Sequence, residues 1–307
     1  MKFLKTKNNF LGISEKEKYS YDTCKYVIQQ VPYEHTSSYL EGSKFGPEAM
    51  VKASQFVEFY DEELDQETYK EHGICTLEPI DFGKKIDQKA VDLIEKNTSK
   101  LIEDGKFVFS LGAEHTVTYG FVKAYHKKYP NLTVLQFDAH SDLRDTYHDN
   151  KFSHASVMAR VHDEGINLCQ AGIRAQCIEE AQLIKNAKNI HTFYAHQIRT
   201  NPNWIQDIID KMTDDVYITI DADGFDPSVI PAVGTAEPNG LFWNESVELF
   251  KQTILQKNVV GIDIVECAPV KENILSEYTL AKLAYKLIGY HSSKKGTVAP
   301  KKTVKSK

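Results

Sequence analysis

The sequence predicts a single α/β domain whose central sheet is mostly parallel and doubly wound, with helices on both faces. Short apolar runs and segments of helical periodicity alternate along the chain, which is the pattern of such a sheet. The sequence shows no internal repeat, linker or composition break before its last residues. Its 307 residues, 41% of them hydrophobic, are enough for one large α/β domain with a substantial core.

Four runs rich in β-branched or aromatic residues are expected to form central strands. They are almost continuously apolar, as strands buried on both faces of a parallel sheet are. These runs are 107–111, 133–137, 216–220 and 259–265, and two weaker runs cover 168–173 and 190–194.

Helices are expected between these strands, because apolar residues recur there every three or four positions. The helical segments are 117–125 after the first run, 204–212 before the third, 247–254 before the fourth and 280–288 after it. Ligands of doubly wound sheets bind beyond the carboxyl ends of the strands, so the functional residues are expected there.

Composition excludes several classes of protein. No window approaches the roughly 18 consecutive apolar residues of a membrane span, and no apolar stretch of the secretory type follows the charged N-terminus. The five cysteines are scattered without a CxxC pair, which favours a reducing cytoplasm over a disulfide framework or a cysteine zinc site.

The charge is distributed unevenly. The formal net charge is −6, although residues 291–307 contain six lysines and no acid. We expect residues 1–290 to form the acidic domain and 291–307 to be a disordered tail. An acidic domain argues against nucleic acid as a partner and is compatible with a small cationic substrate.

Carboxylates and imidazoles follow each of the four central runs. The four runs are followed in turn by GAEH (112–115), DAHSD (138–142), DADGFDP (221–227) and ECAP (266–269). In an extended segment residues i and i+2 point the same way, so Asp138, His140 and Asp142 can converge with Asp221 and Asp223.

This convergence predicts a two-metal site. Crowded carboxylates in a partly buried cleft repel one another and lose hydration, and bound cations relieve both costs. The candidate ligands are His115, Asp138, His140, Asp142, Asp221 and Asp223. This oxygen-rich set without thiolate suits Mn²⁺, and less selectively Zn²⁺, Fe²⁺ or Co²⁺. Two such metals hold a bridging hydroxide against an electrophile, which is the equipment of a hydrolase.

These motifs together resemble the ureohydrolases, the arginase/agmatinase superfamily, over roughly Tyr33 to Tyr290. GAEH resembles the family's GGDH/GGEH element, DAHSD matches DAHxD, and residues 219–241 (TIDADGFDPSVIPAVGTAEPNGL) are similar to the long SxDxDxxDPxxxPxxGTPxPGGL element. Residues 31–53 (VPYEHTSSYLEGSKFGPEAMVKA) look like the N-terminal substrate loop of agmatinases.

The resemblance implies an arginase-like three-layer αβα fold, two Mn²⁺ per subunit and a homotrimer or homohexamer. It implies that His115, Asp138, Asp142 and Asp221 hold one ion and His140, Asp138, Asp221 and Asp223 the other. It further implies that His154, in Ser-His-Ala-Ser, shuttles protons and that Glu266 receives the guanidinium group. Asp142 would orient the metal-bridging hydroxide, and the charge-assisted contact of Glu266 would fix the substrate.

The expected substrate is agmatine, cleaved to putrescine and urea. Residues 149–153 (DNKFS) lack the Ser-Gly-Asn pattern by which arginases grip the α-carboxylate of arginine. The second cation of agmatine would suit acidic side chains, for which Glu34, Asp149, Glu179 and Glu180 are candidates. 4-Guanidinobutyrate, which would need a cation such as Arg144 or Lys151, and arginine remain alternatives.

Two interpretations outside this family of reactions are disfavoured by the motifs of the sequence. A catalytically inactive metal-binding regulator should have lost a ligand, His154 or Glu266, and none is lost. A binuclear metallophosphatase would need a GNH[ED] loop and a later GHxH, and the sequence contains neither.

Overall fold

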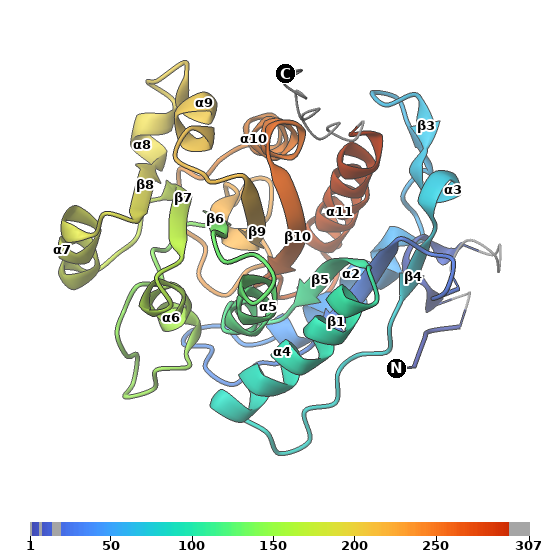
Figure 1. The fold of residues 1–307 in the computed structure, drawn as a ribbon, viewed down its shortest axis with the longest axis horizontal. Coiled ribbons are helices and arrows are strands. Elements are labelled where there is room, and N and C mark those ends of the chain that lie inside the picture. The colour runs from blue at the N-terminus through green and yellow to red at the C-terminus, as the bar shows by residue number, and fades with distance from the viewer. Residues whose placement is uncertain (1, 6–7, 14–19, 295–307) are drawn as a thin grey trace, which may run out of the picture.

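An eight-stranded sheet forms the centre of the molecule (Figure 1). The computed structural model describes residues 2–5, 8–13 and 20–294 of the chain. The strand order is β4-β1-β5-β10-β9-β6-β7-β8, and every neighbouring pair is parallel. The strands are β1 (Tyr26–Val31), β4 (Ile74–Thr76), β5 (Phe107–Gly112), β6 (Thr133–Phe137), β7 (Asn167–Ile173), β8 (Ile190–Tyr194), β9 (Asp215–Asp221) and β10 (Asn258–Val265).

The six predicted strands are confirmed as β5 to β10. Strands β1 and β4 were not predicted. Strand β1 reads YVIQQV, and its two glutamines interrupt the apolar run, although both are buried. Strand β4 is only three residues long, too short for a periodic signal.

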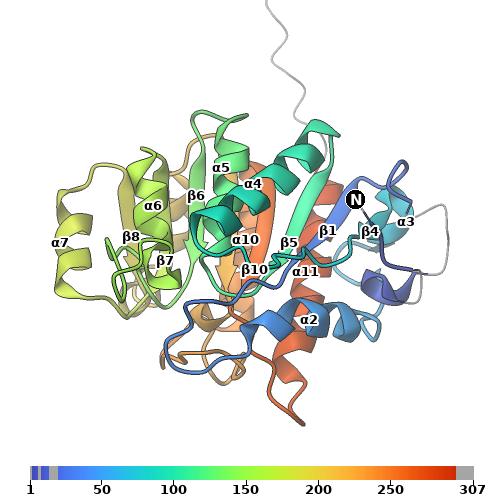
Figure 2. The same ribbon diagram turned by 90° about the horizontal axis from the view of Figure 1, so that it is seen from below.

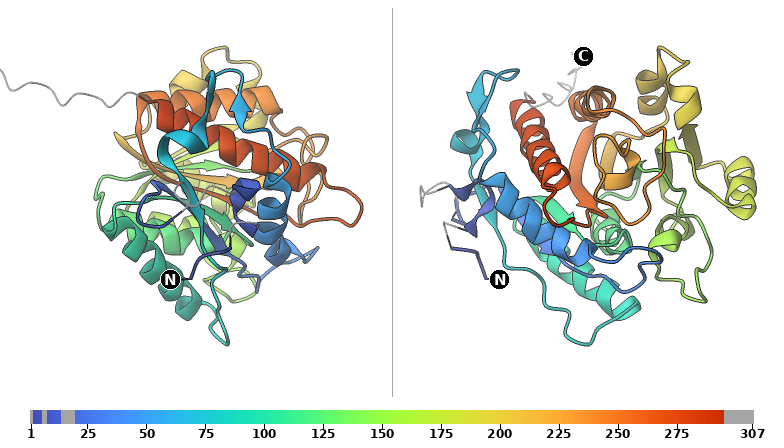
Figure 3. Two further views of the ribbon diagram at one scale, coloured as in Figure 1. Left: turned by 90° about the vertical axis from the view of Figure 1, so that its right-hand side faces the viewer. Right: turned by 180° about the vertical axis from the view of Figure 1, so that it is seen from behind.

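Helices cover both faces of the sheet and make the three layers visible in Figure 3. One face carries α4 (Gln88–Glu103), α5 (Val117–His126), α6 (Val157–Asp163) and α7 (Ile178–Asn186). The other carries α2 (Gly46–Ser54), α3 (Thr68–His72), α8 (Ala195–Ile198), α9 (Trp204–Ile209), α10 (Trp243–Gln256) and α11 (Leu275–Ser293). The predicted helical segments correspond to α5, α9, α10 and α11, and α9 ends before Met212.

The remaining elements are short. They are the 3-10 turns η2 (Phe10–Gly12), η3 (Ser43–Phe45), η4 (His154–Ser156) and η5 (Ala222–Gly224) and a hairpin of β2 (Tyr60–Asp61) with β3 (Gln66–Glu67). Turns η4 and η5 matter for function, because they follow strands that end at the candidate site.

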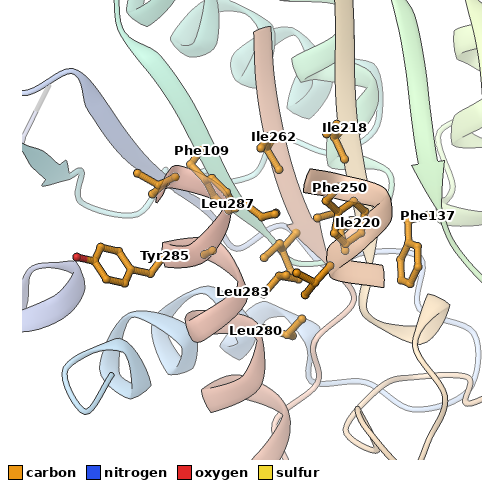
Figure 4. Close-up of a cluster of buried hydrophobic side chains, with 14 of the residues drawn as sticks. Phe109, Phe137, Ile218, Ile220, Phe250, Ile262, Leu280, Leu283, Tyr285 and Leu287 are labelled. Carbon is orange, nitrogen blue, oxygen red and sulfur yellow. The ribbon is translucent and has the colours of Figure 1, made fainter. Parts of the chain in front are cut away.

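A core of buried hydrophobic side chains packs against the central strands. Leu280, Leu283 and Leu287 of α11 belong to the same hydrophobic cluster as Phe109 of β5 and Ile262 of β10, and all five side chains are fully buried (Figure 4). Burying each such side chain contributes about 1.5–3 kcal/mol. The carboxyl ends of these strands are therefore rigid points from which a site can be built.

Helix α11 extends past the predicted domain boundary at residue 290 and ends at Ser293. Residues 295–307, most of the predicted tail, lie outside the described part of the chain. No helix among the described residues is long and apolar enough to cross a membrane. All five cysteines are free thiols.

Candidate active site

The four strands that precede the candidate ligands are direct neighbours in the sheet, in the order β5-β10-β9-β6. Their carboxyl ends therefore meet at one edge, where the loops that follow β1, β9 and β10 also gather (Figure 2). A cavity of about 190 Å³ opens there. Its lining includes four of the six candidate metal ligands, His140, Asp142, Asp221 and Asp223.

His115 faces three carboxylates. Its Nδ1 atom lies 3.0 Å from Asp138 Oδ2, 3.1 Å from Asp142 Oδ2 and 3.2 Å from Asp221 Oδ2. This nitrogen is buried and forms no hydrogen bond of acceptable geometry. Three carboxylate oxygens thus lie around this nitrogen, and the ligand atoms of His115, Asp138 and Asp142 all lie within 4.8 Å of one another.

A second group forms around His140. Its Nδ1 atom lies 3.0 Å from Asp223 Oδ2 and 3.7 Å from Asp138 Oδ1. The two oxygens of Asp138 therefore face the two groups separately, as a bridging ligand requires. Asp221 Oδ1 accepts a hydrogen bond from the backbone N–H of Asp223 at 2.9 Å, which ties the Asp221 carboxylate to the backbone of turn η5.

The candidate ligands His140, Asp142 and Asp221 have pKa values shifted by burial and by crowded charge. Burial lowers the pKa of His140, but Asp223 and its neighbours raise it to about 11. Burial and the neighbouring Asp138 raise the pKa of Asp142 to about 7. Burial, then Asp223 and Asp138, raise the pKa of Asp221 well above its ordinary value. Protons thus compensate the crowded charge, a role that divalent cations fill better because they neutralise several carboxylates at once.

The donor set fits a pair of divalent cations. The free Nδ1 of His115 amid three carboxylate oxygens has the ligand arrangement of a metal position. Imidazoles and carboxylates without thiolate are the ligands that Mn²⁺ accepts, and they do not by themselves exclude Zn²⁺, Fe²⁺ or Co²⁺.

A buried network orients His115 from behind. Thr219 Oγ1 lies 2.9 Å from His115 Nε2 and donates to Asp263 Oδ1 at 2.7 Å. Tyr217 and Thr118 also donate their hydroxyls to Asp263, at 2.7 and 3.1 Å. Because the Thr219 proton goes to the carboxylate, its oxygen accepts from Nε2–H, which leaves the Nδ1 lone pair facing the cluster. Neither Thr219 nor Asp263 was singled out from the sequence, where each stands inside an apolar run.

Glu266 and His154, the predicted substrate residues, both line the cavity. Glu266 Oε1 accepts from the backbone N–H of His115 at 2.6 Å, and burial and the nearby Glu114 raise its pKa well above the ordinary value. Burial, His140 and His115 lower the pKa of His154 to about 4. Asp142 and Glu266 have left-handed backbones, with φ of 53° and 62°, and such strain in non-glycine residues is concentrated at functional sites.

The structure does not place the predicted distal residues in the cavity lining. Glu180 is buried and accepts from the backbone N–H groups of Leu143 (2.8 Å) and Cys177 (2.6 Å), so its carboxylate secures a loop. Glu179 and Asp149 are exposed. The expectation that Glu180 holds the far end of the substrate is therefore corrected, because its carboxylate is occupied by two backbone N–H groups. For Glu179 and Asp149 it stays a prediction.

Glu34 also has a structural role. Its Oε1 accepts from the backbone N–H groups of Gly42 (2.6 Å) and Ser43 (3.0 Å), and this closes the loop after β1. Residues 37–40 of that loop line the cavity, together with Arg144, Tyr147, Gly234 and Thr235. The resemblance pointed to this loop as a whole, and no signal in the sequence singled out its individual residues.

A parallel α/β sheet with two groups of possible metal ligands at its carboxyl edge is the arrangement that two-metal hydrolases use. The sequence model of the arginase family matches residues 24–289. An N(1)-aminopropylagmatine ureohydrolase of Synechocystis sp. is 43% identical over 277 residues, which are 88% of this chain and 90% of the relative. An agmatinase of Bacillus anthracis is 34% identical over 83% of this chain and 87% of its own length.

Among solved structures, the agmatine ureohydrolase of Thermoplasma volcanium superimposes with a TM-score of 0.78 at 30% identity, covering 89% of this chain and 91% of that one. The chain belongs to the arginase family. It is a ureohydrolase, an enzyme that hydrolyses the C–N bonds of guanidino compounds.

Proposed function

We propose that this ureohydrolase uses two Mn²⁺ ions to hydrolyse agmatine to putrescine and urea. The observation that carries the proposal is the pair of ligand groups that share Asp138, beside the half-buried carboxylate of Glu266 that lines the same cavity. His115, Asp138, Asp142 and Asp221 would hold one ion, and His140, Asp138, Asp221 and Asp223 the other. The two metal ions, when bound, would supply an activated water.

The protein's own residues bind and orient the guanidinium group. Glu266 lines the cavity and is half-buried, so its contact with a guanidinium would be charge-assisted and could be bidentate. Asp142 borders the same cavity and would accept a hydrogen bond from the attacking water. The product amine must be protonated before it leaves, and His154 is the cavity-lining imidazole placed outside both ligand groups that could carry that proton.

The cavity is open on its outer side, where the part of the substrate beyond the guanidinium group would lie. Tyr39 and Leu40, which line it, are 76% and 53% exposed, so the site is not closed over a four-carbon chain. Together with the 43% identity to an N(1)-aminopropylagmatine ureohydrolase, this makes N(1)-aminopropylagmatine a second candidate substrate. Both candidates present the same guanidinium to Glu266 and differ only in the length and charge of the far end.

Urea release with Mn²⁺ present tests the proposal. We expect kcat/KM for agmatine or N(1)-aminopropylagmatine to exceed that for arginine and 4-guanidinobutyrate. Arg144 lines the cavity and offers a partner for a carboxylate, so 4-guanidinobutyrate is a stringent competitor. Urea from none of the four guanidines would overturn the proposed activity and favour a metal-binding regulator.

We propose further that the enzyme is cytoplasmic and assembles as a homotrimer or homohexamer. Five free thiols support a reducing compartment. Light scattering of the full-length chain would determine the subunit number.

A further inference from the structure

Thr36, in the loop after β1, contacts His154 twice. Its Oγ1 atom accepts from the backbone N–H of His154 at 3.1 Å, and the same oxygen lies 3.1 Å from His154 Nδ1. The two residues are 118 positions apart in the sequence. The contact therefore ties the loop after β1 to turn η4, which begins at His154.

Glu114 holds the backbone on which Thr36 sits. Its Oε2 atom accepts from the N–H groups of His35 (2.9 Å) and Thr36 (2.7 Å), and its side chain is fully buried. Burial raises the pKa of Glu114, and the hydrogen bonds of His35 and Thr36 oppose that rise. Thr36 is thus fixed from behind by a residue adjacent to the metal ligand candidate His115, so its hydroxyl cannot drift away from the imidazole.

We infer that Thr36 is a positioning residue that fixes the ring of His154 through Nδ1 and leaves Nε2 for proton exchange in the cavity. The inference rests on the proposed function, in which His154 carries the proton to the leaving amine. Thr36 does not itself reach the reacting atoms and is absent from the cavity lining.

A hydroxyl is chemically suited to this position. One lone pair of Thr36 Oγ1 takes the backbone N–H of His154, and the hydroxyl proton remains free to be donated to Nδ1. The neutral imidazole then carries its proton on Nε2. When the ring is protonated, Nδ1–H donates instead to the same oxygen, whose own proton rotates away. The contact therefore persists in both protonation states, which a group that only accepts or only donates could not achieve.

Tyr147 also contacts this ring: the two ring centroids lie 5.6 Å apart in an edge-on arrangement. An aromatic edge limits tilting of the imidazole but cannot choose between its two nitrogens. The contact of Thr36 with Nδ1 is made to a ring nitrogen, so it can select the tautomer of His154.

The first experiment compares Thr36→Val, which keeps the shape and removes the hydroxyl, with Thr36→Ser, which keeps the hydroxyl. For Mn²⁺-loaded enzyme we expect Thr36→Val to lower kcat roughly 10- to 100-fold, because misplaced proton-transfer groups lose that much. KM and Mn²⁺ content should stay within about threefold, and Thr36→Ser should recover most of kcat. Thr98→Val, which removes a buried hydroxyl bond from α4 to Gln29, serves as the matched control and should behave as wild type.

Wild-type kcat in Thr36→Val would overturn the inference. So would an equal loss in Thr36→Ser and Thr36→Val, because the methyl packing and not the hydroxyl would then matter. A loss of Mn²⁺ in Thr36→Val would also overturn it, by showing that Thr36 supports the metal site instead.

The second experiment does not depend on turnover. In ¹⁵N-histidine-labelled full-length protein with diamagnetic Mg²⁺ in place of Mn²⁺, His154→Ala identifies the signals of His154. We expect the wild type to show protonated Nε2 and unprotonated Nδ1, and Thr36→Val to show a mixture of tautomers. Unchanged signals in Thr36→Val would refute the positioning role even if the wild type hydrolysed no guanidine, an outcome that would refute only the proposed function.

Discussion

Asp263 should govern the affinity of the site for Mn²⁺ although it touches no substrate. Its side chain is fully buried and accepts three hydroxyl protons, the shortest from Thr219 and Tyr217 at 2.7 Å. Thr219 in turn holds Nε2 of His115. The perturbation is Asp263→Asn, which preserves the shape of the side chain but turns one acceptor into a donor.

The expected effect follows from where each proton lies along this chain. If the amide introduced by Asp263→Asn donates to Thr219, the hydroxyl of Thr219 is free to donate to His115 Nε2 at 2.9 Å, a shorter contact than the one to Thr118 Oγ1 at 3.2 Å, and the imidazole proton then moves to Nδ1. That proton points at the three carboxylates and opposes the metal. Disturbing such an outer partner typically costs 10- to 100-fold in metal affinity, or about 1.4–2.8 kcal/mol.

Titration of free Mn²⁺ by electron paramagnetic resonance measures the dissociation constant directly. The matched control is Tyr217→Phe, which removes another 2.7 Å hydrogen bond to Asp263 but leaves Thr219 in place. Thermal unfolding of each variant reports any general loss of stability. An unchanged Kd in Asp263→Asn, or an equal loss in Tyr217→Phe, would refute the tautomer argument.

Three further outcomes are expected. Binding of Mn²⁺ near pH 7 should release protons, and the affinity for Mn²⁺ should increase as the pH rises, because His140, whose pKa is raised to about 11, must lose its proton to bind the metal. Calorimetry in two buffers of different ionisation enthalpy measures this release, and equal heats in the two buffers would contradict it. Glu34→Ala removes hydrogen bonds that stabilise the loop after β1 by about 1–3 kcal/mol, so KM should rise roughly tenfold and proteases should cleave that loop faster. In the control Glu41→Ala, which changes an exposed residue of the same loop, KM and the cleavage rate should stay as in the wild type. Gly261→Ala would place a Cβ 2.5 Å from the ring of Tyr125 in the core, so the free energy of unfolding measured with denaturant should fall by about 1–3 kcal/mol. An unchanged free energy of unfolding would show that the ring moves aside without cost.

The candidate metal ligands could be named from the sequence because their signal is local. Asp138, His140 and Asp142 stand two apart directly after an apolar run, and so do Asp221 and Asp223. The pleat of a strand then decides which of them share a face. The same locality explains why the apolar runs located β5 to β10, whereas β1, with two buried glutamines, escaped notice.

The sequence could not predict which way the side chain of an isolated acidic residue points. Glu180 follows the pattern of a substrate residue, yet it turns inward to two backbone N–H groups and never reaches the cavity. One of these partners, Cys177, is only three positions away, but the other, Leu143, lies 37 positions away in the sequence.

By itself the sequence determined the alternation of strands and helices, the ligand types and the edge of the sheet where they belong. Only the tertiary structure decided that β5, β10, β9 and β6 are neighbours, that Thr219 and Asp263 support His115, and that Thr36 reaches His154. The physical reason is range: periodicity acts over a few residues, whereas these contacts join segments 44 to 118 residues apart, and their geometry exists only once the layers have packed.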